Sequence, residues 1–165
     1  MTLHDSELLH RIPIPEHLKE RPSLYYSSSR KWKNFLDSAE VKNKNWMELT
    51  EILLRRAETD EIRSGKKWVW IIDMAEQSIL YKVFIEHLPR MTQYLMERWE
   101  NTLIEVYVLR PSTATLGLLK IVETVLPKDR LGNLHKISGG GLEINARLEK
   151  LGWSLEERRA VVGLL

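Results

Sequence analysis

Few side chains in this sequence have the type and position to do chemistry. Asp73 ends the apolar run "WVWII", and Ser78, His87 and His135 could in principle form a nucleophilic site with it. The serine does not lie in the G-x-S-x-G pattern of a nucleophile elbow, and the spacing gives no reason for these groups to meet. The chain has no cysteine, which excludes thiol nucleophiles, disulfides and zinc–thiolate sites. We therefore expect a protein that is not an enzyme.

The sequence also lacks the common metal-binding motifs. The histidines and carboxylates form neither an H-E-x-x-H helix nor a calcium-binding loop, so we expect no metal and no cofactor. We consider two interpretations of Asp73. Ligands of open α/β sheets bind at the carboxyl ends of strands, which favours a functional role. The alternative is a cap that accepts hydrogen bonds from the backbone of residues 75–77.

The segment "HKISGGGLEINARLEK" places three glycines between a predicted strand and a predicted helix. Backbone N–H groups at such a helix start can bind phosphate, which predicts a phosphate site at Gly139, Gly140 and Gly141 and a small enzyme acting on a phosphate ligand. The segment matches neither G-x-G-x-x-G nor G-x-x-x-x-G-K-[ST]. The alternative is a flexible turn, because glycine accepts many backbone conformations.

Composition restricts the class of protein and its partners. Hydrophobic residues make up 43% and charged residues 29% of 165 residues, which is typical of one globular domain rather than a disordered chain. No apolar run approaches the roughly 20 residues needed to span a bilayer, and the first residues do not resemble a secretory signal. A net charge of +2 predicts no nucleic-acid partner. We expect a cytoplasmic protein.

A basic stretch, interleaved with aromatic residues, runs from position 30 to position 44. It could lie against an anionic membrane surface, where each lysine or arginine contributes about 1 kcal/mol. The alternative is a solvated loop, with one helical turn, whose aromatic side chains anchor it to the core. The basic residues that would contact the membrane are Arg30, Lys31, Lys33, Lys42 and Lys44.

Hydrophobic periodicity predicts strands that alternate with helices. Such an order predicts a single α/β domain with a largely parallel sheet flanked by helices. Residues 1–22 are expected to form a short helix near 5–10 and a connector, and 23–165 the domain. Pro89 predicts a kink or break in its helix. The expected strands are 23–29, 66–73, 103–110 and 134–138, and the other helices are 45–65, 78–99, 112–126, 142–151 and 155–164.

The predicted helix 112–126 is unusually apolar. Its polar side carries Lys120 and Glu123, so the helix should lie on a surface rather than in the centre of the domain. One edge of the apolar stripe can cover the sheet while the other faces a cavity or a neighbouring helix. Within about 160° of its circumference lie Leu118, Leu119, Ile121, Val122, Val125 and Leu126.

Four segments, in this order, resemble the CRAL-TRIO family of lipid-binding domains, especially divergent members found beside Rho-family regulatory domains. Pro111, Leu126–Pro127, Lys128 to Arg130 and Ile137 occupy the family's places in the last segment, while Arg110 stands where the family commonly has asparagine. The segments are "RPSLYYS" (21–27), "NWMELTEILLRRAE" (45–58), "WVWIIDM" (68–74) and "IEVYVLRPSTATLGLLKIVETVLPKDRLGNLHKIS" (104–138).

The resemblance implies a mixed, mostly parallel sheet whose one face is roofed by an apolar gate helix, residues 112–126. Between them it implies a pocket for a phospholipid or other hydrophobic molecule, opened when the gate helix moves at a membrane, and hence peripheral membrane association. The alternative function is a protein-interaction or scaffolding module that uses the same surface with little or no lipid. The expected ligand-binding residues are Trp70, Ile72, Val106, Val108, Leu118, Leu119, Ile121, Val122 and Val125.

Overall fold

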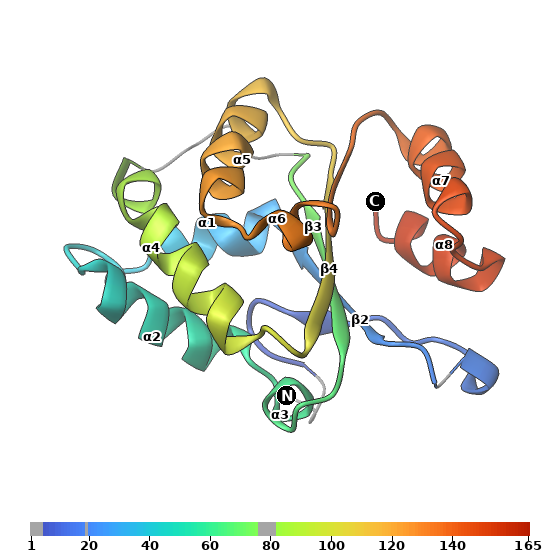
Figure 1. Ribbon diagram of the computed structural model, residues 1–165, viewed down its shortest axis with the longest axis horizontal. Helices are drawn as coiled ribbons and strands as arrows, with labels where there is room; N and C mark the ends of the chain where they lie inside the picture. The colour runs from blue at the N-terminus through green and yellow to red at the C-terminus, as the bar shows by residue number, and fades with distance from the viewer. Residues whose placement is uncertain (1–4, 19, 76–81) are drawn as a thin grey trace.

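The computed structural model describes residues 5–18, 20–75 and 82–165. Within these residues the centre of the fold is one mixed sheet of five strands in the order β1-β2-β3-β4-β5 (Figure 1). The antiparallel β1 lies at one edge, and the other four strands are parallel, as the alternating pattern predicts. The strands are β1 (His10–Arg11), β2 (Ser23–Ser28), β3 (Trp68–Asp73), β4 (Leu103–Leu109) and β5 (Leu134–Ile137).

Helices cover both faces of this sheet. The segments that connect the parallel strands place α1, α2, α4 and α5 on one face, and the C-terminal helices α7 and α8 cover the other (Figure 1). A short 3-10 helix spans Glu16–Leu18. The α-helices are α1 (Ser29–Asp37), α2 (Trp46–Ala57), α3 (Asp60–Arg63), α4 (Lys82–Arg98), α5 (Thr113–Val125), α6 (Lys128–Leu131), α7 (Gly141–Lys150) and α8 (Leu155–Val162).

Two cores result, one on each face of the sheet. Because side chains alternate along a strand, Trp68 and Trp70 of β3 pack toward α2 and α4. Val69 and Ile71 pack on the opposite side with Tyr107 and the residues of α7 and α8. This double burial explains the uninterrupted apolar run of β3, which is typical of a central strand covered on both faces.

One buried serine positions two tryptophans in the first core. The hydroxyl oxygen of Ser27 accepts hydrogen bonds from the indole nitrogens of Trp32, at 3.1 Å, and Trp70, at 3.0 Å. The two indole rings lie 6.0 Å apart between centroids, and Ser27 is completely buried. The serine therefore joins β2, β3 and α1 at one point.

Replacing Ser27 with alanine should lower the free energy of unfolding by about 2 kcal/mol, because two indole N–H groups lose their acceptor. Chemical denaturation of the two proteins measures this difference. The matched control is Ser64→Ala at an exposed position, where the change should stay within about 0.5 kcal/mol. Equal effects at the two positions would contradict the role given to Ser27.

The N-terminal segment differs from the predicted helix at 5–10. Leu8 and Leu9 are fully buried in the first core, and the hydroxyl of Ser6 donates to the carbonyl of Ala57 at 2.6 Å. The chain turns there and continues into β1, which pairs with β2. A helix would leave one of two adjacent leucines outside the core, whereas the turn buries both. Residues 8–12 thus belong to the core of the domain rather than to a connector.

Three helix predictions also differ from the structure. Residues 29–37, expected to be mainly loop, form α1, because Trp32, Phe35 and Leu36 recur at helical spacing and Ser28 caps the helix. The expected helix 45–65 is divided into α2 and α3, since Thr59 caps a new helix start. Of the two outcomes predicted at Pro89, the break does not occur, because α4 is continuous from Lys82 to Arg98, whereas the kink stays a prediction. Residues 76–81 of the predicted helix lie outside the described residues.

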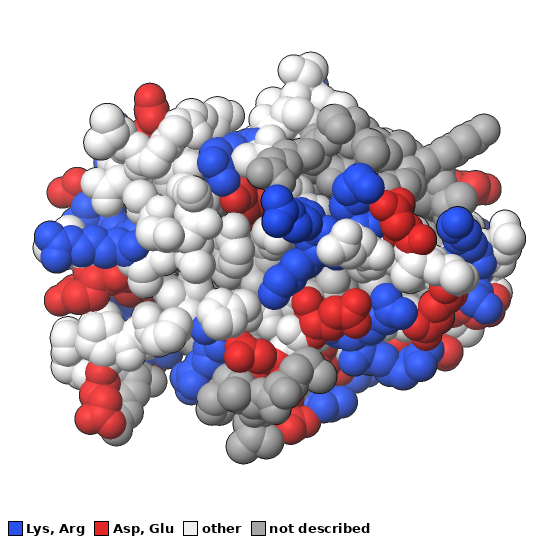
Figure 2. Space-filling model, turned by 180° about the vertical axis from the view of Figure 1, so that it is seen from behind, with Lys and Arg blue, Asp and Glu red and all other residues white. Residues whose placement is uncertain are grey.

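The basic residues expected to contact a membrane lie on α1 and in the loop after it. Lys33 pairs with Asp37 at 2.8 Å, and Lys44 pairs with Glu48 at 3.8 Å. The positive charges of these two lysines are therefore paired with carboxylates. Figure 2 shows basic and acidic side chains interspersed over the back of the molecule. None of the described helices is long and apolar enough to cross a bilayer. Membrane contact through Arg30, Lys31, Lys33, Lys42 and Lys44 stays a prediction.

Candidate functional site

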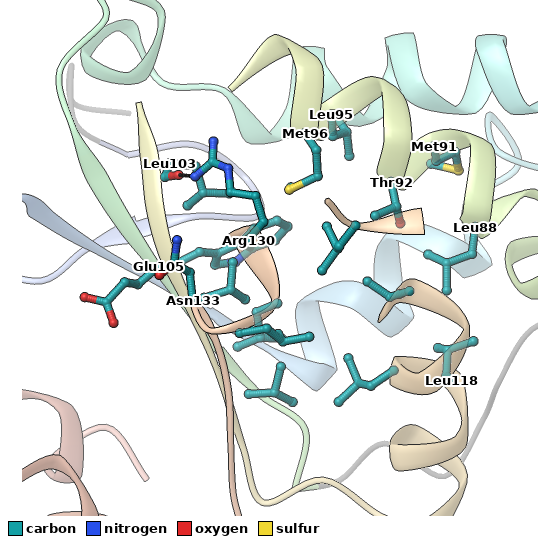
Figure 3. A pocket seen from close by; sticks show the side chains of 18 of the residues that line it. Leu88, Met91, Thr92, Leu95, Met96, Leu103, Glu105, Leu118, Arg130 and Asn133 are labelled. Atoms are coloured by element: carbon teal, nitrogen blue, oxygen red, sulfur yellow. Dashed lines mark hydrogen bonds between the residues drawn. The ribbon is translucent and has the colours of Figure 1, made fainter. Parts of the chain in front are cut away.

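An apolar cavity of about 220 Å³ lies between the sheet and the helices α4 and α5. Its floor is formed by β3 and β4, and α1 and α6 contribute at its margins. Figure 3 shows leucine and methionine side chains of α4 and Leu118 of α5 directed into it. Carbon and sulfur atoms make up nearly all of its surface. An apolar cavity with a few polar groups is typical of a site for a hydrophobic ligand.

Helix α5 forms the roof of this cavity. It begins at a sequence signal: the side chain of Ser112 accepts a hydrogen bond from the backbone N–H of Thr115 at 3.1 Å. It ends just before Pro127, which cannot continue the helix. Thr115 is the only one of its residues that is buried. The leucines and valines of α5 are half-buried, so much of the apolar stripe faces the cavity rather than packed protein.

The structure brings most of the predicted ligand-binding residues to the cavity. Two of the predicted residues, Ile121 and Val125, are not among the lining residues, and Ile121 keeps 36% of its surface exposed. The stripe of α5 is wider than the cavity, so only one edge of the stripe lines it. The predicted residues that line the cavity are Trp70, Ile72, Val106, Val108, Leu118, Leu119 and Val122.

Sequence reasoning missed the second wall of the cavity. This wall is supplied by α4, whose lining residues recur at the 3–4 residue spacing of one helix face, so periodicity carried the signal. It also missed Arg130 of α6 and the neighbouring Asn133, for which no pattern existed. The missed residues of α4 are Leu88, Met91, Thr92, Leu95 and Met96.

Asp73 is a cap, as one of its two interpretations held, and it also forms an ion pair. Its carboxylate accepts from the backbone N–H of Ala75 at 3.1 Å and from the hydroxyl of Tyr26 at 3.0 Å. Arg110 donates to both carboxylate oxygens, at 3.0 and 2.5 Å. Arg110 has a left-handed backbone (φ 54°) at the turn between β4 and α5. The pair therefore fixes the start of the α5 segment to the end of β3.

The described residues considered for nucleophilic catalysis do not pair with one another. Asp73 is paired with Arg110, whereas His135 lies 2.8 Å from a carboxylate oxygen of Glu105 and stacks on Tyr107 at 4.5 Å. Ser78 lies outside the described residues, so no arrangement including it can be drawn. Among the described side chains no cluster of three metal-ligating groups occurs.

A buried tyrosine organises the cluster around His135. The indole N–H of Trp153 donates to the hydroxyl of Tyr107 at 3.1 Å, and that hydroxyl donates to Glu105 at 2.7 Å. Burial, together with the adjacent Glu105 carboxylate, raises the pKa of Tyr107 far above its usual range, so the hydroxyl stays protonated and remains a donor. These contacts hold α7 and α8 against the sheet.

The glycine loop has the geometry of a capped turn. Gly139 adopts φ +98°, which favours glycine, and an added Cβ would lie 2.8 Å from the side chain of Glu143. The backbone N–H of Gly140 donates to the carboxylate of Glu143 at 2.9 Å. The Glu143 carboxylate occupies the place where a phosphate would accept hydrogen bonds from the backbone. Its negative charge would also repel the phosphate. The geometry favours the turn, and Gly139, Gly140 and Gly141 as phosphate ligands remain untested.

In comparisons with known proteins, the chain matches no protein-family model and no curated protein. The fold and the cavity therefore define the class by themselves. The protein is an α/β domain with a mixed, mostly parallel sheet, in which one apolar helix roofs an apolar cavity.

Proposed function

We propose that the protein is a non-enzymatic, cytoplasmic domain that binds a lipid or another hydrophobic molecule in the cavity beneath α5. The observation that carries this proposal is the environment of α5. A helix this apolar ordinarily buries its stripe in protein, yet α5 buries only Thr115 and keeps Leu118, Leu119 and Val122 half-buried at the cavity. A hydrophobic ligand would complete the burial of that surface.

The volume limits what the cavity holds in this conformation. A dry engineered cavity of roughly 150 Å³ binds benzene, and sites for drug-sized ligands span roughly 300–1,000 Å³. At about 220 Å³, the cavity accommodates a small hydrophobic molecule or part of one acyl chain. A complete phospholipid would require α5 to move away from the sheet.

Several features of α5 support such a movement, and with it a role as a gate. The helix is bounded by Pro111 and Pro127, and among the described helices its packing partner is α4. Since few of its side chains are buried, displacement would expose little additional apolar surface. The resemblance of residues 104–138 to the CRAL-TRIO family supports the same role, with the protein acting as a carrier or regulatory module at a membrane surface.

Native mass spectrometry of the protein purified from cells tests the proposal. We expect a fraction of the molecules to carry a co-purified hydrophobic ligand, and the delipidated protein to take up labelled lipid from vesicles. Absence of both co-purified ligand and uptake would overturn the proposal. A variant that fills the cavity, Leu119→Trp, provides the matched sample that should carry no ligand.

A second candidate function is a protein-interaction or scaffolding module. Two large apolar residues on the outside of this region favour it: Ile121 of α5 is 36% exposed and Leu131 of α6 is 38% exposed. A partner that covers them would bind without entering the cavity. Under this alternative, Ile121→Asp abolishes capture of the partner or self-association in sedimentation, whereas substitutions inside the cavity do not.

A further inference from the structure

The cavity beneath α5 is chemically asymmetric. At one end lie Arg130 and Asn133, close to Leu103 at the start of β4 (Figure 3). At the opposite end Figure 3 shows Leu88, Met91 and Leu118, which are all apolar. A ligand that is apolar throughout would leave the polar end without a partner.

Arg130 brings a positive charge to this end. Its guanidinium donates to the backbone carbonyl of Leu103 at 3.0 Å and to the carbonyl of Glu100. These two bonds hold the side chain in place and leave other guanidinium N–H groups free to donate, since arginine carries five. Neutral carbonyls do not balance the charge, and no carboxylate among the described residues lies within ion-pair distance of Arg130.

The carboxylate among the residues that line the cavity is engaged elsewhere. Glu105 contributes to the cavity lining, but its carboxylate accepts from Tyr107 at 2.7 Å and contacts His135 at 2.8 Å. Figure 3 shows the Glu105 carboxylate directed away from the cavity. The Asn133 side chain has no hydrogen-bond partner among the described residues, so its amide can donate to a ligand as well.

From this arrangement we propose that the ligand is a single-chain anionic amphiphile, a fatty acid, whose carboxylate binds Arg130 and Asn133 while its chain extends toward Leu88 and Leu118. The inference rests on the proposed function and names the class of ligand. One acyl chain suits a cavity of about 220 Å³ better than a two-chain phospholipid. An arginine fork matches the geometry of a carboxylate, and charge-assisted bonds of this kind are strong.

Isothermal titration of the whole chain with laurate and with dodecanol, both kept below micelle-forming concentration, tests the proposal. The two ligands share one chain and differ in head group, so the ratio of their affinities isolates the charge. We expect laurate to bind about tenfold more tightly than dodecanol. From octanoate to decanoate to laurate, each added methylene should raise the affinity about fourfold until the cavity is filled.

Substitution of Arg130 shows whether this residue is responsible. Arg130→Gln should abolish the preference for laurate over dodecanol, whereas Arg130→Lys should retain part of the preference. The matched control is Lys128→Gln, an exposed cation on the same short helix, which should retain all of it. Thermal unfolding checks that each variant is folded, and the wild-type comparison of the two ligands needs no variant.

The outcomes separate the inference from the function on which it rests. If neither laurate nor dodecanol binds, the proposed hydrophobic site is itself refuted. If both bind equally, or if Arg130→Gln weakens them equally, the cavity binds hydrophobic ligands but the carboxylate assignment is wrong. A laurate preference that is lost in Arg130→Gln and kept in Lys128→Gln supports the inference.

Discussion

Replacing Val122 with aspartate is expected to abolish binding of a hydrophobic ligand while the protein remains folded. Val122 lines the cavity from α5 and is only half-buried, so in the empty protein a carboxylate there can stay hydrated. Once an acyl chain fills the cavity, the carboxylate loses that water without gaining a partner. The cost should weaken binding by about 100-fold or more, as measured by displacement of a fluorescent fatty acid.

The preceding residue provides a matched control. Ile121→Asp introduces the same charge on the same helix, but Ile121 does not line the cavity and is 36% exposed. Its affinity for the fluorescent fatty acid should stay within about twofold of wild type, because a solvated surface charge contributes little. Equal losses in the two variants would indicate that aspartate acts on α5 as a whole, which would contradict a site limited to one edge of the stripe.

The contrast between Ile121 and Val122 also shows which features of the site can be predicted from the sequence. The position and ends of α5 follow from local chemistry: a serine cap at Ser112, helical periodicity, and proline after Leu126. The sheet likewise follows from β3 and β4, whose apolar runs alternate with helices. Local periodicity does not distinguish Ile121 from Val122, because both lie within the same stripe. Their different surroundings depend on how far α5 stands from the sheet, which is a tertiary property.

Several contacts that prediction missed also depend on tertiary structure. The pair Leu8 and Leu9 is buried by a turn that depends on the end of α2 and on Ala57, far away in the sequence. Arg110 meets Asp73 because β3 and β4 are neighbours and end at the same edge. Arg130 lines the cavity because α6 returns to the start of β4. None of these contacts has a signature within one segment, whereas a helix cap does.

A buried carboxylate joins α2 to α4 on the cavity side of the sheet. Glu58, at the C-terminal end of α2, accepts two hydrogen bonds from the guanidinium of Arg98, each at 2.8 Å, and a third from the indole of Trp99, also at 2.8 Å. Burial alone would raise the pKa of Glu58, but the bonds from Arg98 and Trp99 and the charge of Arg98 hold this pKa below its usual value of 4.5. The pair thus stabilises the ionised form.

Arg98→Met should therefore lower the free energy of unfolding at pH 7 by about 3 kcal/mol, near the low end for breaking a buried pair because Arg98 is itself partly exposed. In the wild type, the depressed pKa gives stability that is present above 4.5 and is lost as pH falls through the folded-state pKa. In the variant, burial without the guanidinium should raise the pKa of Glu58 instead. Protonation then relieves the buried charge, so the deficit of the variant should shrink as pH falls.

Urea denaturation of both proteins from pH 7 to acidic pH measures the difference. Arg90→Met is the matched control, because Arg90 lies on the same helix and is exposed; its effect should stay within about 0.5 kcal/mol at every pH. A deficit in Arg98→Met that does not change with pH would show that Arg98 acts through the packing of its aliphatic chain rather than its charge. A deficit that disappears as Glu58 protonates ties the α2–α4 contact, and with it one wall of the cavity, to this ion pair.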